Sequence, residues 1–273
     1  MCDCSILYST LMSDIDINIR ECETVDDFKQ CIELERAVWN DEDLGIMPIR
    51  LYMISKACRA PTIGAFDGSG KIVGFVHTML ALVGKYVAYH SHLAAVQERL
   101  RHKDIGFRMK LAQRDHAIEA GIPLIFWTFD PLSSRNAHLN INKLGAVIRR
   151  YEENYYGEGL SSVFDPDIPS DRVFAEWWVG SPHVRATLEG KRPEINASTK
   201  VAIPDDIVSV RSRAVDEHLR WRLQARAGFT DALATGQIVR GFQRDAERGE
   251  SYYLFGPDEE QFRFETYESI ATL

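Results

Sequence analysis

Two groups of residues in the middle of the chain combine types and spacings that could serve chemistry. The first is a basic cluster between Gln97 and Asp115, where six basic residues accompany three acidic ones in a chain of formal net charge -8. Its basic members are Arg99, Arg101, Lys103, Arg108, Lys110 and Arg114. The cluster straddles a predicted turn and the first two turns of a helix, where unpaired backbone N–H groups and the helix dipole favour an anion. We therefore expect a phosphate-bearing ligand here, and the alternative is an ordinary solvated helix face.

The second group is a pair of histidines, His90 and His92, on a segment that alternates as a strand does. Residues two apart on a strand point to the same face, so the two imidazoles are expected side by side. An imidazole with an ordinary pKa of about 6.5 can act as a general base at neutral pH. The alternatives are a hydrogen-bonded structural histidine and a metal site, but the sequence offers no third ligand and its five cysteines lack zinc-site spacing. We predict no metal.

Periodicity and end signals predict the elements that position these residues. Strands are expected at 16–22, 62–66, 72–82, 86–96, 124–129, 146–156 and 172–179, and helices at 24–39, 48–59, 105–120 and 134–144. Thr24 has the character of the first helix's N-cap, and Gly121 and Gly145 close the last two helices. Because a hairpin half precedes a βαβ half, we expect an α/β (α+β) fold with a mixed sheet and helices on both faces.

The chain is long enough for more than one domain. We expect a tail over 1–15, a main domain over 16–180, an irregular linker over 181–199 and a smaller α/β domain over 200–273. In the last region the sequence pattern predicts a strand at 200–203, mostly helix over 205–234, and strands at 237–243 and 252–255. This order weakly echoes the start of the chain, but no residue-level repeat supports a duplication.

Motifs around the basic cluster resemble those of a known family. Val96 precedes Gly106 by ten residues, and Arg101-His102-Lys103-Asp104-Ile105-Gly106 resembles the coenzyme A pyrophosphate loop, Q/R-x-x-G-x-G/A, of GNAT superfamily acyltransferases. Arg101 and Gly106 match that pattern, whereas Asp104 replaces its first glycine. Downstream, Ala137 and Lys143-Leu144-Gly145-Ala146 resemble the family's second signature, the helix and turn that flank coenzyme A. Residues 127–137 resemble the sequences of an uncharacterised GNAT subgroup that carries an additional C-terminal region. The likeness covers roughly 16–179.

The resemblance implies a GNAT-like, mainly antiparallel twisted sheet and a set of site residues. Backbone groups of Ala94, Ala95 and Val96 would meet the pantetheine arm of coenzyme A, and the loop and helix start would hold the pyrophosphate. The residues implied there are Arg101, His102, Lys103, Asp104, Ile105, Gly106, Phe107 and Arg108, with Asn136, Asn140 and Lys143 on the later helix. His90, six residues before Val96, would be the base, with His92 as its neighbour. The family's tyrosine acid is replaced by Ile141, which leaves Tyr151, Tyr155, Tyr156, water or no acid to protonate the thiolate.

The implied activity is acyl-CoA-dependent N-acyl transfer, with acetyl-CoA or another acyl-CoA as co-substrate and a small amine as acceptor. Asp41, Glu42 and Asp43, in the loop where the family binds its acceptor, would favour a cationic amine. The alternatives are a noncatalytic acyl-CoA-binding or regulatory protein and a scaffold whose basic turn binds a partner. The net charge argues against nucleic acid, and no apolar run reaches the roughly 20 residues of a membrane span. We expect a cytoplasmic protein with reduced cysteines, which could form a homodimer.

Overall fold

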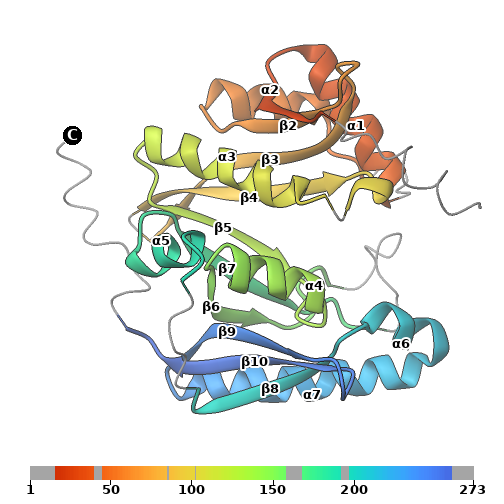
Figure 1. The fold of residues 1–273 in the computed structure, drawn as a ribbon, viewed down its shortest axis with the longest axis vertical. Coiled ribbons are helices and arrows are strands. Elements are labelled where there is room, and N and C mark those ends of the chain that lie inside the picture. Colours follow the sequence, from red (N-terminus) through yellow and green to blue (C-terminus); the bar gives the residue numbers. More distant parts are fainter. Residues whose placement is uncertain are drawn as a thin grey trace, which may run out of the picture. The chain divides into compact units, whose positions relative to one another are not determined.

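The computed structural model describes residues 16–39, 45–84, 86–101, 103–157, 168–191 and 197–259 (Figure 1). The chain divides into two compact units. Unit 1 comprises Met1–Thr78 and Leu93–Gln113, and unit 2 comprises Met79–His92 and Arg114–Leu273.

The described part of unit 1 combines neighbouring strands of the sheet with helices from the first half of the chain. Its elements are β1 (Asn18–Glu21), α1 (Val25–Trp39), α2 (Ile49–Ala57), β2 (Thr62–Phe66), the start of β3 (Ile72–Val83), the end of β4 (Tyr86–Val96), the short 3-10 helix η1 (Glu98–Leu100) and most of α3 (Ile105–Glu119). The strands are ordered β1-β2-β3-β4, and both the β1–β2 and the β2–β3 pairs are antiparallel.

Local signals explain where the elements of unit 1 begin and turn. The amide of Asp27 donates to Thr24 Oγ1 at 3.1 Å, while the amides of Glu23 and Thr24 donate to Asp27 Oδ2 at 3.0 and 3.2 Å. This reciprocal arrangement is a capping box, and it confirms Thr24 as the N-cap. The β2–β3 turn ends at Gly70, whose φ of 82° is easily adopted only by glycine.

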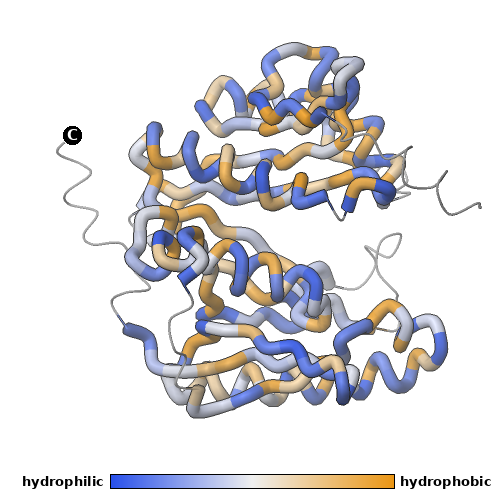
Figure 2. Tube along the Cα trace, in the orientation of Figure 1, coloured by the Kyte–Doolittle hydropathy of each residue, from blue (hydrophilic) through white to orange (hydrophobic). Residues whose placement is uncertain are grey.

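The core of unit 1 lies in two clusters. One gathers Phe28 and Cys31 of α1, Tyr52 of α2 and Phe75 of β3. The other gathers residues of the strands with Leu100 of η1 and Ile105 and Met109 of α3. Helices α1 and α2 therefore pack on one cluster and α3 on the other. Figure 2 shows that α3 carries both hydrophobic and hydrophilic residues along its length, and Lys110 and Gln113 are buried together with Ile105 and Met109.

Unit 2 holds the remaining elements. They are the end of β3, the start of β4, the end of α3, β5 (Leu124–Phe129), α4 (Ser134–Ala137), the π-helix η2 (His138–Lys143), β6 (Val147–Glu152), β7 (Arg172–Trp178), α5 (Pro182–Leu188), β8 (Thr199–Pro204), α6 (Ile207–Arg213), α7 (Val215–Ala234), β9 (Gln237–Asp245) and β10 (Glu250–Pro257). The strands follow the order β3-β4-β5-β7-β6-β9-β10-β8. Strand β4 pairs with β5 in parallel, and the pairs from β5 to β8 are antiparallel. Helix α7 runs behind β8 and β10 in the view of Figure 1. The expected mixed, mainly antiparallel sheet flanked by helices is confirmed.

The C-terminal region differs from the expectation in two respects. Pro182–Leu188 form helix α5 where irregular chain was expected, because Ser181 Oγ accepts the amide of Val184 at 3.2 Å and proline suits the first turn. The strands after 199 also belong to the same compact unit as residues 114–180, and Ile148 of β6 pairs with Val239 of β9. Independent folding of 16–180 and 200–273 stays a prediction.

Strand pairing also decides whether the C-terminal elements repeat the first ones. Strand β1 pairs with β2, the first strand after its helices, whereas β8 pairs with β10, the second strand after its helices. The two βααββ stretches therefore have different topologies, and the similar element order is no sign of duplication.

Candidate functional site

The turn into α3 keeps a glycine-like backbone although it carries an aspartate. Asp104 has a φ of 53°, in the left-handed region that the family's first glycine would adopt freely. Aspartate tolerates this region better than most residues because its short polar side chain can hydrogen-bond locally. The amide of Lys103 donates to Leu100 O at 3.1 Å, and the amide of Arg108 donates to Asp104 O at 3.0 Å. Asp104 therefore holds a turn conformation that is open to a glycine at the same position.

Gly106 lies in the first turn of α3 with open space beside it. A Cβ built there meets only Val96 Cγ2 at 4.0 Å, an ordinary contact, and the φ of Gly106 is not positive. Gly74, in contrast, is required by packing, because a Cβ there would lie 3.2 Å from both Ala95 O and Met109 Cε. Glycine costs about 0.5–1 kcal/mol in a helix relative to alanine. Neither the backbone nor the packing of unit 1 explains Gly106, whereas the close approach of a ligand would.

Basic side chains surround this turn. Lys103 and Arg108 are exposed, and Arg108 Nη2 donates to Ile17 O at 2.8 Å. Arg101 Nη1 lies 3.9 Å from Glu98 Oε1. Phe107 is partly buried, and Ile105 is buried in the core, where it fixes the start of the helix. His102 lies outside the described residues.

The end of β4 leads directly into this turn. Ala94 is exposed, Ala95 is buried, and Val96 packs against the cluster that contains Ile105. The amide of Gln97 donates to Val73 O at 2.9 Å, which ties the strand end to β3. The predicted pantetheine contacts Ala94, Ala95 and Val96 thus lie on a regular strand end with one exposed position.

The two predicted catalytic histidines lie on the part of β4 that belongs to unit 2. The ring centroids of His90 and His92 are 5.5 Å apart, and the His90 ring lies 4.9 Å from the Phe126 ring. His90 and Phe126 are also partners in the parallel β4–β5 register. His92 is exposed to solvent, yet desolvation by its neighbours lowers its pKa below 6.5. A histidine with a lowered pKa is neutral at pH 7 and can accept a proton.

The predicted helix over 134–144 is one α-helical turn followed by a π-helix. Ser133 Oγ accepts the amide of Asn136 at 3.4 Å and caps α4. Asn136 is exposed, Asn140 is buried, and Lys143 is partly buried. Short π-helical turns occur frequently at functional sites.

None of the three tyrosines considered as alternative proton donors has a geometry that favours this role. Ile141 is 3% exposed and cannot donate a proton. Tyr151 donates its hydroxyl to Asp171 Oδ2 at 2.5 Å, and burial together with this hydrogen bond raises its pKa well above 10. Tyr155 and Tyr156 pack edge to face with ring centroids 4.9 Å apart.

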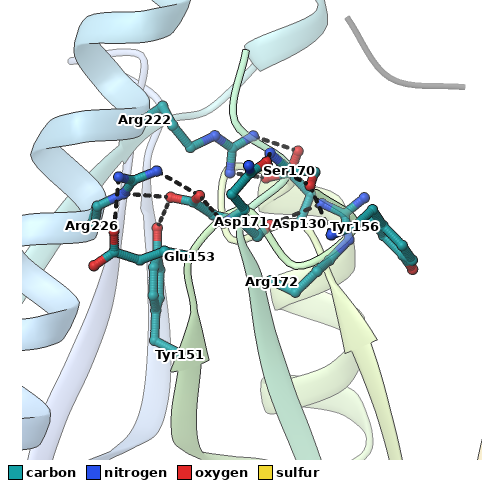
Figure 3. A network of polar contacts seen from close by, with 10 residues as sticks. Asp130, Tyr151, Glu153, Tyr156, Ser170, Asp171, Arg172, Arg222 and Arg226 are labelled. Atoms are coloured by element: carbon teal, nitrogen blue, oxygen red, sulfur yellow. Dashed lines mark hydrogen bonds and ion pairs between the residues drawn. The ribbon is translucent and has the colours of Figure 1, made fainter. Parts of the chain in front are cut away.

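Sequence reasoning missed a network of ion pairs in unit 2 (Figure 3). Arg222 of α7 binds Asp130 with both terminal nitrogens, at 2.7 and 2.8 Å. One turn later, Arg226 binds Asp171 at 3.0 and 2.7 Å and also Glu153 at 2.9 Å. The sequence held one sign of this network: Arg222 and Arg226 lie on the same side of α7 as the buried Ala225 and Phe229.

Across the described ranges, no three or more His, Cys, Asp or Glu side chains gather as a metal site. Among the helices that the structure describes, none is both long and apolar enough to cross a membrane. The acidic loop with Asp41, Glu42 and Asp43 lies outside the described residues.

Comparisons with solved structures find similarity to acetyltransferases. A GNAT-family acetyltransferase from Streptococcus pneumoniae is 18% identical, with a TM-score of 0.46, covering 59% of this chain and 98% of that chain. The ribosomal-protein-S18-alanine N-acetyltransferase from Escherichia coli is 13% identical, with a TM-score of 0.47, covering 60% and 94%. Mosquito arylalkylamine N-acetyltransferase like 5b is 16% identical, with a TM-score of 0.47, covering 59% and 99%. No protein-family model and no curated protein matches the sequence. Because these TM-scores lie below 0.5, the candidate site at the start of α3 is inferred from this chain's own residues alone.

Proposed function

We propose that the chain is an acyl-CoA-dependent N-acyltransferase that transfers an acetyl group directly to a small amine. The observation that carries the proposal is the turn into α3. There Asp104 keeps the left-handed conformation and Gly106 has open space that the fold does not require.

The chemistry of this turn suits a pyrophosphate. The first N–H groups of a helix have no acceptor in the preceding turn, so those of Ile105 and Gly106 are available to phosphate oxygens. The exposed cations Lys103 and Arg108 add positive charge nearby. Asp104 is exposed, so solvent can screen its charge while its backbone holds the turn. Asn136, Asn140 and Lys143 stay predicted contacts of coenzyme A.

Acyl transfer needs an amine that loses its proton and a thiolate that gains one. Bound acetyl-CoA would supply the thioester carbon for attack. His90 is the proposed base, because its imidazole can accept the amine proton, and His92 packs beside it. No described tyrosine is proposed as the acid, so water protonates the thiolate.

A noncatalytic acyl-CoA-binding protein is the second candidate. It is favoured by Ile141, which is buried where the resemblance implies a proton donor. Both candidates require the same binding step, and they differ only in turnover.

Calorimetry with acetyl-CoA on the full chain tests the binding step. The expected result is saturable heat at tens of micromolar protein and a rise in melting temperature. Absence of both would refute both candidates. Where binding is found, a thiol-release assay over a panel of small amines separates them, because only the enzyme releases coenzyme A in an amine-dependent way.

A further inference from the structure

Helices and strands of the C-terminal region make several hydrogen bonds to the segment that connects β5 with β6 in unit 2. We call this connection, from Asp130 through α4 and η2 to Lys143, the α4 segment. Arg222 of α7 binds Asp130, Tyr253 of β10 donates to Pro131 O at 2.7 Å, Ser134 Oγ donates to Asp205 Oδ1 at 2.8 Å, and Asn142 Nδ2 donates to Phe242 O at 2.8 Å. The bonds reach the segment from its first residue to its π-helix. The C-terminal elements therefore hold the whole segment in place.

The Arg222–Asp130 pair lies at the start of the segment, where it fixes a turn. Asp130 Oδ1 accepts both Arg222 and the amide of Leu132 at 2.8 Å, and the amide of Ser133 donates to Asp130 O at 2.9 Å. Ser133 then caps α4 through the amide of Asn136. Arg222 thus fixes the Asp130 carboxylate, the carboxylate fixes the turn, and the turn fixes the start of α4.

The pair is strong because the guanidinium is buried. The Arg222 side chain is 2% exposed and meets the carboxylate with two parallel hydrogen bonds. Burial alone would raise the pKa of Asp130, but the charge and hydrogen bonds of Arg222 hold it below its ordinary value. A bidentate ion pair also fixes direction as well as distance. Asp130 is therefore ionised and held in one orientation at neutral pH.

We propose that Arg222 is a positioning residue for acyl-CoA binding, which it serves by fixing through Asp130 the turn that aims the α4 segment. This inference rests on the proposed function, because the α4 segment carries the predicted coenzyme A contacts Asn136, Asn140 and Lys143. On this proposal the C-terminal region supports the residues that bind acyl-CoA and is no separate module.

Helix α7 offers a matched control one turn away. Figure 3 shows Arg226 bound to Asp171 beside the first pair; two of its nitrogens bind the carboxylate, and the Asp171 side chain is fully buried. Asp171 precedes β7, and within the part of the chain that the structure describes Arg226 bonds to Asp171 and Glu153, neither of which belongs to the α4 segment. Loss of Arg226 leaves the fully buried Asp171 with one partner fewer, and loss of Arg222 leaves the Asp130 carboxylate, 34% exposed, without its guanidinium partner, so both changes should lower stability. Only loss of Arg222 should disturb the α4 segment.

The test compares Arg222→Gln, Arg222→Lys and Arg226→Gln in the full chain, by melting temperature, acetyl-CoA calorimetry and hydrogen exchange of residues 130–143. Both glutamine variants are expected to melt earlier. Arg222→Gln should weaken acetyl-CoA binding by roughly tenfold to a hundredfold and speed exchange in the α4 segment. Arg222→Lys should restore part of both, and Arg226→Gln should change neither.

Equal changes in binding for the two glutamine variants would overturn the proposal, since they would indicate a general loss of stability. Unchanged binding and exchange in Arg222→Gln would overturn it as well. If Arg222→Gln does not fold, Asp130→Asn combined with Arg222→Gln removes both charges, keeps the acceptor for the Leu132 amide and takes its place. If the wild type binds no acetyl-CoA, the proposed function falls, and the exchange comparison still decides whether Arg222 holds the segment.

Discussion

Replacement of Gly106 by alanine should separate folding from binding. The new Cβ would meet only Val96 Cγ2, at 4.0 Å, so no atom of unit 1 must move. Alanine is favoured over glycine in a helix, and it also reduces the freedom of the unfolded chain. The variant should therefore be about 0.5–1 kcal/mol more stable than the wild type in urea unfolding.

Acetyl-CoA binding should move in the opposite direction. The methyl group occupies the open space beside the N–H groups that we assign to the pyrophosphate. A hydrogen bond to a charged group is worth about 1.5–3 kcal/mol, so its loss weakens binding about tenfold to a hundredfold. Calorimetry of Gly106→Ala and the wild type under the same salt concentration measures this change.

Gly68→Ala is the control for that experiment. It lies in the β2–β3 turn, where a Cβ meets nothing within 4 Å and the φ is not positive. Its acetyl-CoA affinity should equal that of the wild type. A folded Gly106→Ala variant with wild-type affinity would refute the close approach of a ligand at Gly106. A less stable Gly106→Ala variant would show that the space beside this residue is needed by the fold.

Three further predictions concern titratable groups. Burial opposes the charge of Asp27, but hydrogen bonds from Arg20 and two backbone amides lower its pKa to about 2. The ionised group adds about 2 kcal/mol to the free energy of unfolding above pH 4, and this is lost as the pH falls to 2. Asp27→Asn should flatten the pH dependence of the unfolding free energy between pH 4 and 2. Burial and Arg240 lower the pKa of His183 from 6.5 to about 4, so stability should fall by about 3 kcal/mol as pH drops from 6.5 to 4, and His183→Gln should abolish that slope in urea titrations. His90→Gln should lower kcat by about a hundredfold or more and leave the acetyl-CoA Kd unchanged, and a wild-type rate would remove His90 as the base.

Elements set by local signals were predicted closely. Strand β4 was expected at 86–96 and spans Tyr86–Val96, because alternating residues between two turns mark it. The helix over 134–144 was placed correctly but changes from α to π at His138, and hydrophobic spacing cannot distinguish these two hydrogen-bond patterns. Helix α5 was missed although Ser181-Pro182 is a common helix start.

The site shows a different limit of sequence reasoning. From residue types alone, Asp104 counts as the loss of a glycine from the phosphate loop. The structure shows that Asp104 has a φ of 53°, a conformation that glycine adopts readily, so the loop's backbone shape and its side chain are separate questions. Side-chain charge is visible in a sequence, whereas backbone conformation at a single turn residue depends on the bonds around it. Those bonds are the Leu100–Lys103 and Asp104–Arg108 contacts.

The ion pairs of α7 could have been anticipated in part. Arginines at 222 and 226 share a helix side with the buried Ala225 and Phe229, and a charge on a buried helix face is tolerated only when an opposite charge pairs with it. The sequence therefore indicates that two acidic partners exist. It cannot identify them, because Arg222 and Asp130 are 92 residues apart and many acidic residues compete. Asp130 directly follows β5 and Asp171 directly precedes β7, so α7 holds the ends of two neighbouring strands, of which only β5 leads into the α4 segment.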